Sequence, residues 1–154
     1  MKIVVITQED KFVIPKNLLE LVNISGVSVD AVFVLDTGNS LDNKKGLFVR
    51  GFGLIQAGKM FCALLHKNVS CWLSSVSRGL MLRRHQTIKQ ICYRNSIEYR
   101  IAHDINDQSV LSGIRSMSPD IIISYSAPSV FRPELLAIPV IGCINLHCSL
   151  LPSF

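Results

Sequence analysis

Two polar side chains lie close together in an apolar stretch near the end of this sequence. Asn145 and His147 are two positions apart in "VIGCINLHC", and alternate residues of a β-strand share one face. An amide donates hydrogen bonds without titrating, whereas the charge of histidine changes near neutral pH. The pair could therefore polarise a carbonyl group and hold an oxyanion. The spacing also fits two satisfied core groups, and taken alone it favours that structural interpretation.

The cysteines give no sign of a metal or disulfide site. They are odd in number, lie mostly in apolar runs and form no Cys-x-x-Cys pair of the kind that binds zinc. Consecutive strand residues point to opposite faces, so His147 and Cys148 cannot easily share an ion. We expect no metal and a reduced, cytoplasmic setting. The five cysteines are Cys62, Cys71, Cys92, Cys143 and Cys148.

The composition is that of one folded domain. The chain has 154 residues, of which 49% are hydrophobic, enough for a substantial core. The formal net charge of +5 is modest and spread along the chain, so it favours anionic partners only weakly. No apolar run approaches the length of a membrane span, and the first one breaks at Gln8, too early for a signal peptide. We expect neither a membrane nor DNA as a partner.

Short apolar runs alternate with stretches of helical periodicity along the chain. Such alternation is typical of a doubly wound α/β fold, in which helices cover both faces of a mostly parallel sheet. The strands are expected near residues 3–7, 30–36, 97–102, 120–125 and 140–148. The helices are expected near residues 15–26, 53–68, 79–95, 106–117 and 133–136, with Asn106 or Asp107 capping the fourth.

In sheets of this kind, ligands bind beyond the carboxyl ends of the strands. A dinucleotide would need glycines directly after the first strand, but the sequence there is "TQEDKF". Its two acidic residues would repel a pyrophosphate, so NAD or FAD binding at this turn is not expected. Residues 83–94 form a basic surface, which a solvated helix face explains better than a nucleic-acid site.

The residues that follow Asn145 favour a functional interpretation of this side chain over a structural one. The stretch "NLHCSLLPSF" closely resembles the Asn-x-His-x-Ser-Leu-Leu-Pro signature of the folate-dependent formyltransferase family. The resemblance extends back through "PDIIISYSAPSVFRPELLAIPVIGC", so residues 119–154 carry it. The earlier part of the chain is compatible with the Rossmann-like domain of that family.

The resemblance implies an enzyme that transfers a formyl group from 10-formyltetrahydrofolate to an amine. It assigns Asn145 and His147 to stabilisation of the tetrahedral intermediate and to proton movement. It also places the folate along Ser129, Val130 and Phe131, where apolar neighbours and free backbone groups suit a flat pterin.

One part of the family pattern is missing from this sequence. A catalytic Asp is expected a few dozen residues beyond the signature, whereas the sequence ends at Phe154. We therefore expect a single formyltransferase-like domain over residues 1–154, truncated after the signature and incomplete at its C-terminal end, and we expect the chain as given to be inactive. The alternative is a non-catalytic remnant that binds folate or a protein partner.

The sequence leaves the formyl acceptor open. Family members that act on glycinamide ribonucleotide resemble one another in a Gly-rich loop after the first strand, and those that act on methionyl-tRNA usually show Gly-Thr-Pro there. The sequence "TQEDK" matches neither pattern. A sugar amine or another small-molecule amine is therefore at least as well supported as tRNA, which the basic surface keeps as a possibility. The oligomeric state is also left open.

Overall fold

The structure is a computed structural model that describes residues 1–10, 13–36 and 86–146, together with residues 55, 58–59, 61–63, 65–66 and 68–69. The chain divides into two compact units. One consists of Met1–Asp36 with Ile88–Phe154, and the other of Thr37–Thr87. In the second unit the described positions between residues 55 and 69 are helical, in line with the helix predicted over residues 53–68. The first unit contains the sheet.

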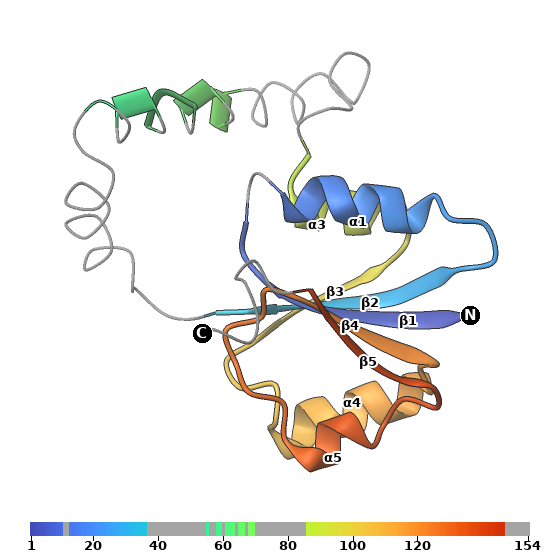
Figure 1. Ribbon diagram of the computed structural model, residues 1–154. Helices are drawn as coiled ribbons and strands as arrows, with labels where there is room; N and C mark the ends of the chain where they lie inside the picture. Colours follow the sequence, from blue (N-terminus) through green and yellow to red (C-terminus); the bar gives the residue numbers. More distant parts are fainter. Residues whose placement is uncertain are drawn as a thin grey trace. The chain divides into compact units, whose positions relative to one another are not determined.

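The sheet has five parallel strands in the order β3-β2-β1-β4-β5. Figure 1 shows β1 in the middle of the sheet, with β2 and β4 on either side of it. The strands are β1 (Lys2–Gln8), β2 (Ser28–Leu35), β3 (Glu98–Ala102), β4 (Ile121–Tyr125) and β5 (Gly142–Leu146). This arrangement confirms the doubly wound α/β fold predicted from the sequence.

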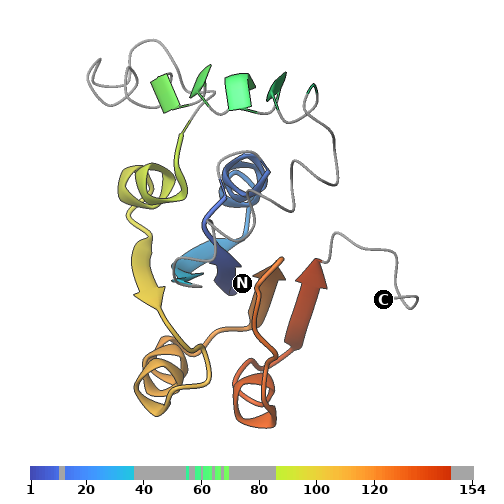
Figure 2. The same cartoon turned by 90° about the vertical axis from the view of Figure 1, so that its left-hand side faces the viewer.

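Helices cover both faces of the sheet. In Figures 1 and 2, α1 and α3 lie on one face, and α4 and α5 lie on the other. Each face buries its own apolar cluster, because alternate residues of the central strands point to opposite sides. The helices are α1 (Ile14–Val22), α3 (Ile88–Arg94), α4 (Gln108–Met117) and α5 (Pro133–Leu136).

The central strand shows why a short apolar run becomes a strand covered on both sides. Five consecutive residues of β1 are buried, from Ile3 to Thr7. Ile3 and Val5 join the cluster under α1 and α3, whereas Val4 and Ile6 join the cluster under α4 and α5. A half-exposed strand would instead alternate apolar and polar residues.

The strand order creates a switch point between β1 and β4. From β1 the chain proceeds outward through β2 to β3, and from β4 it proceeds in the other direction to β5. Loops at the carboxyl ends of these two strands therefore diverge to opposite faces, which leaves a crevice where ligands bind in open α/β sheets. Among the described residues, no helix is long and apolar enough to cross a membrane.

Candidate functional site

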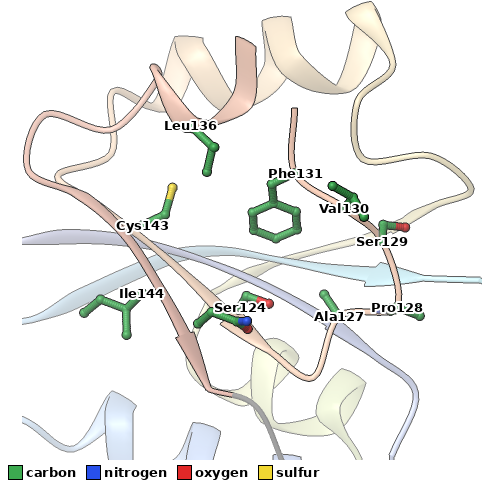
Figure 3. Close-up of a pocket in the computed structure, with 10 residues that line it drawn as sticks. Ser124, Ala127, Pro128, Ser129, Val130, Phe131, Leu136, Cys143 and Ile144 are labelled. Carbon is green, nitrogen blue, oxygen red and sulfur yellow. The ribbon is translucent and has the colours of Figure 1, made fainter. Parts of the chain in front are cut away.

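A cavity of about 610 Å³ lies at the carboxyl end of β4 and β5. Its walls come from these strands, from the loop that joins β4 to α5, and from α5 itself (Figure 3). The apolar part includes Phe131, Leu136 and Cys143, and the polar part includes Ser124 and Asn145. Its volume and its mostly apolar walls are those of a small-molecule site.

Asn145 reaches this cavity because of its register in β5. It lies opposite Ser124 of β4, on the side of the sheet covered by α4 and α5, and both residues line the cavity. Leu146 lies opposite Tyr125 and lines a different cavity, next to α1. Asn145 and Leu146 thus face opposite sides, as the strand pattern predicted. His147 lies outside the described residues.

The loop predicted to hold the folate lines the same cavity. Ser129, Val130 and Phe131 all contribute to its wall, and the side chain of Phe131 also packs against the apolar cluster under α4 and α5. Val130 is 85% exposed, so its side chain does little to fix the loop. The fold therefore brings these three residues together with Asn145, from which they are separated by more than a dozen positions in the sequence.

Hydrogen bonds from Asn106 connect this loop to the turn before α4. The Asn106 side-chain amide donates to the Val130 carbonyl at 3.0 Å and accepts from the Arg132 backbone N–H at 3.0 Å. The sequence predicted Asn106 or Asp107 as the cap of the helix. Asp107 is the N-cap residue, as one of the two predicted alternatives, but it makes no side-chain cap hydrogen bond, and the Asn106 amide binds the loop.

The surroundings of two titratable groups, Cys143 and Asp104, shift their pKa values. Burial raises the pKa of the Cys143 thiol, which keeps this thiol mostly protonated near neutral pH. The pKa of the Asp104 carboxyl is lowered, first by the hydrogen bond from the Asn106 backbone, then by the Asn106 side chain and the nearby positive charge of Arg132. Asp104 is therefore ionised at neutral pH, and a carboxylate faces Asn106.

The second cavity, of about 350 Å³, lies between the ends of β1, β4 and β5 and the start of α1. There the Asp10 carboxylate accepts hydrogen bonds from the backbone N–H groups of Val13 and Ile14, at 2.6 and 2.9 Å. These are the groups that would bind a phosphate at a helix N-terminus. A pyrophosphate would have to displace a like-charged carboxylate, which gives a structural reason against a dinucleotide here.

Part of the basic surface predicted over residues 83–94 can be placed. Lys89 and Arg94 are exposed on α3, whereas Ile88, Ile91 and Cys92 of the same helix are buried in the cluster under α1 and α3. The helix is thus amphipathic, with charge on its solvent side. Arg83, Arg84 and His85 lie outside the described residues.

No protein-family model matches the chain. Three curated relatives are methionyl-tRNA formyltransferases. The one from Clostridioides difficile is 33% identical over 67 residues, covering 44% of this chain and 22% of the relative. The one from Magnetococcus marinus is 29% identical over 79 residues, covering 51% and 25%. The one from Clostridium tetani is 35% identical over 68 residues, covering 44% and 22%.

The parallel sheet with helices on both faces, and the cavity at its carboxyl edge, define a Rossmann-like α/β protein. The relatives support the resemblance of this chain to the formyltransferase family that the signature around Asn145 predicted. The chain matches about a quarter or less of the length of each relative.

Proposed function

We propose that this chain provides the formyl-donor site of a formyltransferase, which transfers a formyl group from 10-formyltetrahydrofolate to an amine. The observation that carries the proposal is the shared cavity, since Asn145 lines it together with Ser129, Val130 and Phe131. The resemblance to the family assigns a catalytic role to the first of these residues and folate binding to the other three.

The cavity fits the chemistry of a reduced folate. Its volume of about 610 Å³ falls in the range of sites for drug-sized ligands. Phe131, Leu136 and Cys143 offer apolar surface to the faces of a pterin, and Ser124 and Asn145 offer hydrogen bonds at the strand ends. We propose that the pterin lies along the loop before α5 and that the formyl group points toward Asn145.

Formyl transfer requires a group that stabilises negative charge on the formyl oxygen. The acceptor nitrogen attacks the formyl carbon, a C–N bond forms, and the bond from that carbon to the folate nitrogen then breaks while a proton passes from the amine to the departing nitrogen. The Asn145 amide would donate to the oxygen in the tetrahedral intermediate. A donor placed in advance typically accelerates such a step about a hundredfold or more. His147, as the neighbouring polar residue of the signature, would move the proton.

The first acceptor to test is the amino group of methionyl-tRNA, because the relatives are named for transfer to this substrate. An amino sugar is the second, because Gln8, Asp10 and Asn17 around the smaller cavity are polar groups that suit a hydroxylated amine.

Calorimetric titration with 5-formyltetrahydrofolate, a stable analogue of the donor, tests the site directly. We expect saturable binding that is lost in Ala127→Trp, which fills the cavity, and retained in Ala137→Trp, which alters an exposed residue after α5. Transfer of a labelled formyl group to each acceptor tests the reaction, in a longer protein that adds the Asp expected beyond the signature, because the chain as given is expected to be inactive. Binding without transfer to any amine would favour the non-catalytic folate-binding alternative. The absence of binding would refute the proposed site.

A further inference from the structure

We propose that Asn106 is a positioning residue for the donor cavity, which holds the loop of Val130, Phe131 and Arg132 in its binding conformation. This inference rests on the proposed function for its ligand but on the structure for its geometry. Asn106 does not line the cavity, and it acts through the backbone of residues that do.

The side-chain amide of Asn106 forms hydrogen bonds with the loop on both sides of Phe131. Its Nδ2 donates to the Val130 carbonyl at 3.0 Å, and its Oδ1 accepts from the Arg132 backbone N–H at 3.0 Å. These partners are 24 and 26 residues away in the sequence. One amide thus bonds to a carbonyl and an N–H two residues apart, as a neighbouring strand would.

A neighbouring carboxylate determines which way the Asn106 amide points. Asp104 Oδ1 accepts from the backbone N–H of Asn106 at 2.9 Å and from its Nδ2 at 3.1 Å. An ionised carboxylate accepts hydrogen bonds only, so it must face the NH₂ end of the amide. The Oδ1 end then points toward Arg132 and accepts a hydrogen bond from its backbone N–H. The amide is oriented before any ligand binds.

Other contacts hold this loop weakly. Val130 is 85% exposed, and Ser129 and Phe131 are only partly buried. Two directional bonds on either side of Phe131 therefore hold the backbone at this residue, whose ring packs against the apolar cluster under α4 and α5 and forms part of the cavity wall (Figure 3). A loop with few buried side chains samples other conformations once such bonds are removed, and a ligand must then order it on binding.

Two substitutions separate this positioning role from simple packing. Asn106→Ala removes both bonds to the loop. Asn106→Asp keeps the volume of the side chain, but its second oxygen would face the Val130 carbonyl and Asp104, both of which only accept hydrogen bonds. We expect both variants to bind 5-formyltetrahydrofolate about tenfold or more weakly than the unaltered chain. Asn23→Ala, at an exposed asparagine after α1, is the matched control and should bind normally.

Amide hydrogen exchange gives a second test of the positioning role, and this measurement needs no ligand. The Arg132 N–H should exchange slowly in the unaltered chain and in Asn23→Ala, and faster in both Asn106 variants. The Leu111 N–H, bonded to the Asp107 carbonyl in α4, should be unaffected and reports on the fold. If Asn106→Ala folds poorly, Asn106→Asp, which preserves volume, carries the same comparison.

The outcomes are distinguishable. Weaker binding with faster Arg132 exchange and normal Leu111 exchange supports the positioning role. The positioning role would be overturned if both Asn106 variants matched the unaltered chain in folate binding and in Arg132 exchange. It would also be overturned if Asn106→Asp behaved normally while Asn106→Ala did not, because side-chain volume alone would then explain the effect. If the unaltered chain binds no reduced folate, the proposed function fails, and the exchange of Arg132 still decides whether Asn106 holds the loop.

Discussion

Replacing Asn145 by alanine should impair chemistry at the cavity and leave the fold almost unchanged. The Asn145 side chain is exposed at the edge strand of the described sheet, and such substitutions usually change the free energy of unfolding by no more than about 0.5 kcal/mol. A donor aimed at a developing oxyanion, by contrast, is worth about a hundredfold in rate. The same substitution should therefore have a small effect on stability and a large effect on turnover.

Leu18→Ala is the matched control with the opposite expectation. Leu18 is 0% exposed and belongs to the cluster under α1 and α3, on the face of the sheet away from the donor cavity. Its truncation should leave a cavity and cost about 2 to 5 kcal/mol, which for a chain of this size is roughly 4 to 20 °C in melting temperature. The molecules that remain folded should transfer formyl groups at the normal rate.

The assay pairs thermal melting, followed by circular dichroism, with formyl transfer at saturating donor and acceptor, and the rates are measured in a longer protein that adds the catalytic Asp expected beyond the signature. Donor affinity of Asn145→Ala should fall only a few-fold, since one neutral hydrogen bond contributes about 1 kcal/mol. If Asn145→Ala melts as early as Leu18→Ala and its folded fraction turns over normally, Asn145 is structural. The proposed mechanism would then be refuted.

Three further predictions concern the thiols, the core and the sheet edge. Because burial raises the pKa of Cys143, a smaller fraction of this thiol is ionised at pH 8, and iodoacetamide should alkylate it more slowly than the exposed Cys62. Bound 5-formyltetrahydrofolate should slow the alkylation of Cys143 further. Equal alkylation rates of the two cysteines, measured by peptide mass spectrometry, would contradict this prediction. Thr7→Val removes a buried hydroxyl that donates to the Tyr125 carbonyl at 3.0 Å and should cost about 1 kcal/mol in urea denaturation, whereas an unchanged midpoint would mean that the bond adds nothing. Ile144 is 48% exposed on the edge strand, so the chain should self-associate at tens of micromolar and Ile144→Lys should reduce this in light scattering; a monomeric unaltered chain would count against it.

The sequence by itself determined the elements of the sheet and the face on which Asn145 lies. A buried strand needs an unbroken apolar run, and residues 3–7, 30–36 and 120–125 each have one, so β1, β2 and β4 were predictable within a residue or two. The alternation of strand side chains is equally local, and it separates Asn145 from Leu146 whatever the rest of the chain does.

Only the tertiary structure decided what surrounds Asn145. The pairing of β4 with β5 places Ser124 opposite it, and the turn into α5 brings Phe131 to the same cavity. Nothing near Asn106 in the sequence predicts a bond to a loop 24 residues later, and its local pattern favoured a helix cap. Local propensities depend on neighbours along the chain, whereas the amide of Asn106, in the turn before α4, finds its partners only after the crossover through α4 and β4 has brought the next loop beside it.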